Sequence, residues 1–113
     1  MLVAGGSLAG SERLSMLERY QLTSRVESGD ILAAKLLAGH YGIWEGDYEK
    51  MMFWTLKSAE LGDPADQYNY GVYLVEKKKN FADGLKWINK SAAASFKGAR
   101  NYLLNKESII GSK

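Results

Sequence analysis

Residues 47–62 read DYEKMMFWTLKSAELG, and residues 80–95 read NFADGLKWINKSAAAS. The two stretches align without gaps at a spacing of 33, and both contain a tryptophan, two variable residues and then lysine, serine and alanine. A spaced match of this kind is not expected by chance, and a period of roughly 20–50 residues is typical of repeat proteins. The alignment therefore predicts two copies of one structural unit.

The segments that precede these stretches also correspond. Residues 33–41 (AAKLLAGHY) match residues 65–73 (ADQYNYGVY) at a spacing of 32, with alanine, glycine and tyrosine in common, and Gly-Asp precedes each segment. A weaker third copy begins at Ser95. One unit is therefore predicted to be a helix, a short turn, a second helix and a glycine exit.

Local signals set the ends of these helices. Asp47 and Asn80 stand at the positions of N-caps, where their side chains accept amide hydrogens of the first helical turn. Gly62 is placed as a helix stop, because glycine adopts positive φ at little cost. Asp63 then caps a new helix that has Pro64 at its first position.

The pattern predicts an all-α fold of antiparallel helical hairpins. The chain has 113 residues, one proline and no cysteine, which favours long helices and excludes disulfides and thiolate sites. The expected single domain spans 11–108, between a flexible N-terminus at 1–10 and a tail at 109–113. It divides into a capping helix at 11–28 opened by Ser11, repeat one at 29–61, repeat two at 62–94, and a half repeat or cap at 95–108. The expected helices are 11–27, 30–43, 48–61, 64–76, 81–95 and 97–108.

The run Trp54–Gly62 (WTLKSAELG) resembles the Sel-one-like repeat, a helical unit related to the tetratricopeptide repeat. The Asp47-Tyr48 pair and the run Gln67–Gly71 (QYNYG) also match that unit, and the similarity covers about residues 29–104. Two positions depart from it, Gly84 and Ser95, and the loop between the helices of the first copy is shortened to about 42–46. The resemblance implies a right-handed α–α superhelix, a short solenoid that binds proteins. Bacterial members often act in signalling, secretion or toxin–immunity pairs.

Residues that recur at equivalent repeat positions are interpreted as packing residues. Gly39 and Gly71 fall within helices, where glycine costs about 1 kcal/mol relative to alanine, so both are expected to permit close approach between helices. The two tryptophans are expected to fill space between stacked helices. The structural set is Gly39, Trp54, Ala59, Gly62, Gly71, Trp87 and Ala92.

The first helices of the hairpins are expected to line a concave groove that binds a protein or peptide. Tyr68, Val72 and Val75 are predicted to point into the groove, and Tyr70 and Leu74 toward the core. For Tyr68, an interface role and a core role both remain open. For His40, the single histidine, the alternatives are a structural role and a contact in the groove. The predicted partner-binding residues are Leu36, His40, Trp44, Tyr68, Val72, Val75, Asn101 and Asn105.

Charge is distributed unevenly along the chain. Residues 1–76 carry six basic and eleven acidic residues, whereas residues 77–113 carry nine basic and two acidic ones. An alternative function is therefore binding of nucleic acid or an acidic partner, although no nucleic-acid motif accompanies the charge. Its candidate residues are Lys77, Lys78, Lys79, Lys86, Lys90, Lys97 and Arg100.

No catalytic or cofactor pattern is present, so we expect a non-catalytic adaptor or immunity protein without cofactor or metal. Glu45, Asp47 and Glu49 do not have calcium-loop spacing and are interpreted as capping and solubility residues. No membrane span and no convincing signal peptide are found, so a cytoplasmic location is the default and a secreted or periplasmic one stays open. Exposed solenoid ends also allow an end-to-end homodimer.

Overall fold

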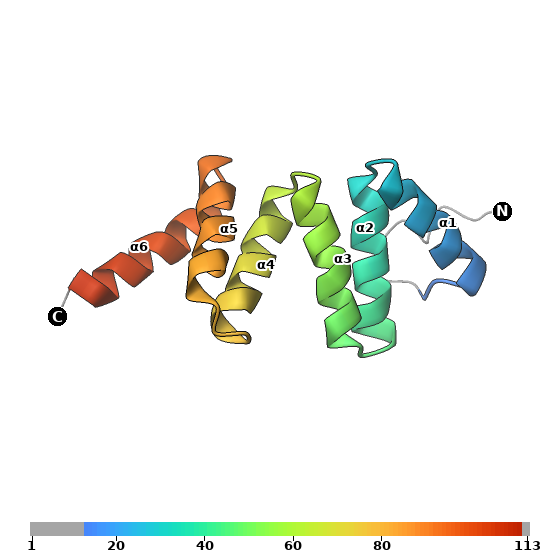
Figure 1. The fold of residues 1–113 in the computed structure, drawn as a ribbon, viewed down its shortest axis with the longest axis horizontal. Helices are drawn as coiled ribbons and strands as arrows, with labels where there is room; N and C mark the ends of the chain where they lie inside the picture. Colours follow the sequence, from blue (N-terminus) through green and yellow to red (C-terminus); the bar gives the residue numbers. More distant parts are fainter. Residues whose placement is uncertain (1–12, 112–113) are drawn as a thin grey trace. The chain divides into compact units, whose positions relative to one another are not determined.

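The computed structural model describes the backbone of residues 13–111 and the side chains of residues 13–105. Within these limits the fold is all-helical and contains no strand (Figure 1). The elements are α1 (Met16–Glu27), α2 (Ile31–Gly39), the π-helical turn η2 (His40–Trp44), α3 (Tyr48–Glu60), α4 (Pro64–Glu76), α5 (Phe81–Ala93) and α6 (Lys97–Gly111).

The predicted start of the first helix is wrong. Residues 13–15 are not helical, and α1 begins at Met16 with Ser15 as its N-cap. The Ser15 hydroxyl accepts the Glu18 amide hydrogen at 3.1 Å, and the Glu18 carboxylate accepts the Ser15 amide hydrogen at 2.8 Å. This reciprocal capping box fixes the helix start. The predicted cap Ser11 and the N-terminus 1–10 lie outside the described residues.

The other helix ends follow the capping residues closely. Asp47, Asp63 and Asn80 each accept an amide hydrogen from the residue three positions on, as predicted. The second predicted helix, 30–43, is interrupted, because α2 gives way to the π-helical turn at His40. At the other end of the chain, α6 continues into the predicted tail as far as Gly111.

Contacts divide the chain into two compact units, Met1–Leu61 and Gly62–Lys113, and their boundary coincides with the predicted boundary between the repeats. In the first unit, α2 packs against both α1 and α3. Its apolar core extends from Leu14, two residues before α1, to Leu37 near the end of α2, and Tyr41 and Trp54 pack against it. The buried members are Leu14, Leu22, Val26, Ala33, Ala34, Leu36 and Leu37.

In the second unit, α4 and α5 lie side by side as an antiparallel hairpin and α6 packs mainly on α5 (Figure 1). The hairpin is tight because two glycines face each other. A Cβ atom on Gly71 would lie 2.8 Å from the Gly84 carbonyl oxygen, and one on Gly84 would lie 2.8 Å from the Gly71 carbonyl oxygen. The close-approach role predicted for Gly71 is confirmed, and Gly84 is its partner.

The second helix of each repeat is followed by a residue with positive φ, and the residue type at this equivalent position differs between the repeats. Gly62 has φ +111° and Ser95 has φ +68°, both in the region that glycine tolerates and that costs other residues about 1–2 kcal/mol. Gly62 thus has the helix-stop role predicted for it. At Ser95 the same left-handed exit is formed without glycine.

We expect reciprocal exchange of these two residues to have opposite effects. Gly62→Ser should lower the free energy of unfolding by about 1–2 kcal/mol, and Ser95→Gly should raise it by about 0.5–1 kcal/mol. Urea denaturation followed by circular dichroism measures both. A loss of stability in Ser95→Gly would contradict the prediction and would give weight to the 3.5 Å contact between the Ser95 hydroxyl and Arg100.

Two equivalent serines differ in their hydrogen bonding. Ser58 and Ser91 are both fully buried. The Ser91 hydroxyl donates to the Pro64 carbonyl at 2.7 Å and so ties α5 to the start of α4. The Ser58 hydroxyl has no hydrogen-bond partner within the described part of the chain. Burying a hydroxyl without a partner is unfavourable.

Alanine substitutions at these two sites should therefore diverge. Ser91→Ala is expected to cost about 1–2 kcal/mol, whereas Ser58→Ala is expected to leave stability within about 0.5 kcal/mol or to raise it. The two variants remove the same atom from the same repeat position, so each is the control of the other in denaturation. Equal losses in both variants would show that the Pro64 contact contributes nothing.

Candidate functional site

The predicted groove residues of the second unit lie against α6. Val75 is buried in the core with Ile88 and Ala99, so its assignment to a groove is wrong. Tyr68 and Val72 pack on the same cluster, and the Tyr68 ring centroid lies 5.6 Å from Phe96. They are not free for a partner, because Phe96, just before α6, and Ala99 and Tyr102 of α6 belong to the same packed cluster. Asn101 and Asn105 are exposed on α6 itself.

Tyr70, which was expected to face the core, is half-buried. Its ring lies 5.7 Å from that of Tyr73 and 6.0 Å, edge to face, from that of Trp87. In the hairpin it therefore lies beside Trp87, the tryptophan of the second repeat.

The predicted groove residues of the first unit divide between core and surface. Leu36 is 5% exposed and belongs to the core, and His40 is fully buried, so neither is available to a partner. Trp44 keeps 44% of its surface exposed. The first unit therefore presents Trp44 but not the continuous groove expected from helical spacing.

His40 connects three elements of the first unit. Its Nδ1 accepts the Leu14 amide hydrogen at 3.1 Å, so Nε2 carries the proton of the neutral ring. Nε2 then donates to the Glu45 carboxylate at 2.8 Å, and a guanidinium nitrogen of Arg19 lies 3.1 Å from Nε2. The π-helical turn makes this pair possible, because its five-residue spacing places residue 45 over residue 40.

This cluster is structural. Both ring nitrogens of His40 are engaged in hydrogen bonds and the ring has no exposed surface, so a substrate cannot reach it. The hydrogen bond from His40, with the charges of Arg19 and Lys50, lowers the pKa of Glu45 below its usual range. Of the two interpretations of His40, the structural one is confirmed.

The basic residues do not form one patch. Lys77, Lys78 and Lys79 precede α5, and Lys97 and Arg100 follow it, so about 20 Å of helix separates the two groups. Between them, Lys86 lies 4.0 Å from the Asp83 carboxylate and Lys90 lies over the Trp87 ring at 5.4 Å. The seven basic residues are therefore distributed along the length of α5 and its two ends.

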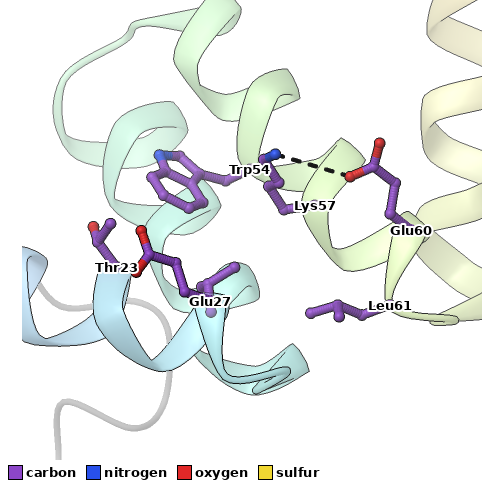
Figure 2. A pocket seen from close by; sticks show the side chains of 7 residues that line it. Thr23, Glu27, Trp54, Lys57, Glu60 and Leu61 are labelled. Atoms are coloured by element: carbon purple, nitrogen blue, oxygen red, sulfur yellow. Dashed lines mark ion pairs between the residues drawn. The ribbon is translucent and has the colours of Figure 1, made fainter.

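A surface pocket of about 220 Å³ lies between α1 and α3 in the first unit (Figure 2). It exists because α1 and α3 both pack on α2, which leaves space between their outer faces. The Trp54 indole forms one wall, and Thr23 and Glu27 face it from α1 (Figure 2). The lining residues are Thr23, Val26, Glu27, Trp54, Lys57, Glu60 and Leu61.

The charges around the pocket are only partly compensated. Lys57 lies 3.9 Å from the Glu60 carboxylate and 5.2 Å from the centre of the Phe53 ring. Among the described residues, Glu27 makes neither a hydrogen bond nor an ion pair. The pocket thus combines an aromatic wall with one uncompensated carboxylate.

Sequence reasoning missed this pocket. Of its lining residues only Trp54 was singled out, and as a packing residue; it is half-buried, touching the core on one side and the pocket on the other. The available signal was weak: Thr23, Val26 and Glu27 share one face of α1, and Trp54, Lys57 and Leu61 share one face of the second helix of repeat one. The sequence does not show that these two helix faces lie on either side of one pocket, because that depends on the tertiary structure.

Comparison of the chain with known protein families, curated proteins and solved structures finds no match. The likeness to Sel-one-like repeats therefore rests on the sequence motifs at 47–48, 54–62 and 67–71 alone. Among the described residues, no group of three or more histidine, aspartate or glutamate side chains could hold a metal ion. Nor does that part of the chain contain a helix long and apolar enough to cross a membrane.

Proposed function

We propose that the chain is a non-catalytic interaction module of the Sel-one-like type, a right-handed helical solenoid that binds a protein partner. The observation that carries the proposal is the pocket between α1 and α3, in which the half-buried Trp54 is accessible. Tryptophan is enriched among residues that dominate binding energy, particularly where a pocket receives an anchor from the partner. Trp54 thus serves both packing and binding.

The size of the pocket favours a protein partner over a small molecule. Its volume of about 220 Å³ lies below the range of about 300–1,000 Å³ typical of cofactor and metabolite sites. A single side chain of a partner fits better in such a space. An adaptor or toxin-immunity role in a bacterium is the form that this function takes in the family that the repeat resembles.

The test is capture of partners by the tagged chain and by two pocket variants. Trp54→Ala removes the aromatic wall, and Thr23→Phe fills the pocket while leaving Trp54 in place. Both should lose a partner that the unaltered chain retains. The matched control is Trp87→Ala, which removes the equivalent tryptophan of the second repeat.

Retention of the partner by Thr23→Phe, with circular dichroism showing intact helices, would contradict a role for the pocket. Equal loss in Trp87→Ala would place binding elsewhere.

A further inference from the structure

The two repeat tryptophans differ in what covers their rings. In the second repeat, Lys90 lies over the Trp87 ring at 5.4 Å. In the first repeat, the equivalent lysine, Lys57, lies over Phe53 at 5.2 Å and beside Glu60. The sequence explains the difference, because position 53 is phenylalanine in repeat one whereas its equivalent in repeat two is Lys86. Within the described residues, no cation covers the Trp54 ring.

We infer that the pocket selects a cationic side chain of the partner, arginine in particular, which stacks on Trp54 and pairs with Glu27. The inference rests on the proposed function and specifies what the pocket accepts. A cation over an indole is attracted by the ring, and Trp87 shows that this repeat position supports such a contact.

Arginine fits the combination of wall and carboxylate better than lysine. Its planar guanidinium stacks on an aromatic face while its N–H groups remain free to donate to a carboxylate at the edge. Glu27 faces Trp54 from α1 (Figure 2) and makes no ion pair or hydrogen bond with any other described residue. A guanidinium between Trp54 and Glu27 would stack on the indole and form an ion pair with the carboxylate.

Lys57 is the one cation in the lining and opposes this occupant. Glu60, at 3.9 Å, offsets its charge, so the three charged residues of the lining leave one net negative charge. The inference therefore predicts effects of opposite sign for two neighbours. Removing the charge of Glu27 should weaken binding, and removing that of Lys57 should strengthen it.

The test uses three capped pentapeptides, Gly-Gly-X-Gly-Gly, in which X is arginine, citrulline or norleucine. Citrulline has nearly the shape of arginine without its charge. Nuclear magnetic resonance titration follows the indole N–H signal of Trp54, assigned by its loss in Trp54→Phe. The arginine peptide should shift this signal saturably, and the citrulline peptide should bind at least threefold more weakly.

Three variants refine the result. Glu27→Gln should weaken arginine-peptide binding about two- to fivefold, as expected for an exposed ion pair, and Lys57→Met should strengthen it by a similar factor. Glu49→Gln removes a carboxylate from the first turn of α3, outside the pocket, and should leave the affinity for the arginine peptide unchanged.

Equal binding of citrulline or norleucine would overturn the selectivity while leaving the pocket as a docking site. Weaker binding in Lys57→Met, equal loss in Glu49→Gln, or no shift with any peptide would also overturn it. Partner capture with Thr23→Phe decides the proposed function separately.

Discussion

Replacing Gly71 with alanine is expected to lower the free energy of unfolding of the α4–α6 unit by about 2–3 kcal/mol. The added Cβ would lie 2.6 Å from Ile88 Cγ1, 2.8 Å from the Gly84 carbonyl oxygen and 3.1 Å from the Ile88 amide nitrogen. Two of these three atoms belong to the α5 backbone, so the helices must separate to admit the methyl group. The better helix propensity of alanine, worth about 1 kcal/mol, offsets only part of this cost.

Gly42→Ala is the matched control for this substitution. Its Cβ would overlap the Met51 side chain, with the sulfur as the nearest atom. A thioether at the end of a flexible side chain can move away, so we expect a loss below about 1 kcal/mol. Chemical denaturation of both variants measures the difference. Equal stability of Gly71→Ala and the unaltered chain would show that the α4–α5 contact is not as close as described.

His40→Ala is expected to cost about 3 kcal/mol in the first unit. The substitution leaves a cavity in a fully buried position, removes the acceptor of the Leu14 amide hydrogen and deprives Glu45 of its donor. Hydrogen exchange should show the effect locally, with faster exchange at Leu14 and in η2. Binding at the α1–α3 pocket should survive in the folded fraction, because His40 does not line it.

Two polar replacements separate the roles of the ring nitrogens. His40→Asn places an oxygen near the position of Nδ1 and should restore part of the Leu14 hydrogen bond. His40→Gln reaches toward Glu45 instead and should restore part of that contact. If both variants are as unstable as His40→Ala, packing of the ring outweighs its hydrogen bonds.

The helical fold and much of its local detail follow from the sequence. The gapless repeat at a spacing of 33 predicted the hairpin helices, and Asp47, Asp63 and Asn80 predicted where three of them begin. These predictions hold because capping and helical periodicity depend on neighbours within a few residues. The close approach at Gly71 was also predictable, because a glycine retained within a helix indicates a contact that a side chain would block.

Tertiary structure alone decided which surfaces are open. Helical spacing placed Tyr68, Val72 and Val75 on one face of α4 but could not show that Phe96 and residues of α6 pack in one cluster with them. The buried position of His40 likewise involves a partner distant in the sequence, Leu14, whose amide hydrogen its ring accepts.

The repeat tryptophans show the same division between sequence and tertiary structure. The sequence established that Trp54 and Trp87 are equivalent. Only the fold shows that Lys90 covers one ring while Lys57 turns to Phe53 and leaves the other facing a pocket. Residues of the same type at equivalent positions acquire different roles because exposure and charge pairing are set by neighbours that the repeat does not share.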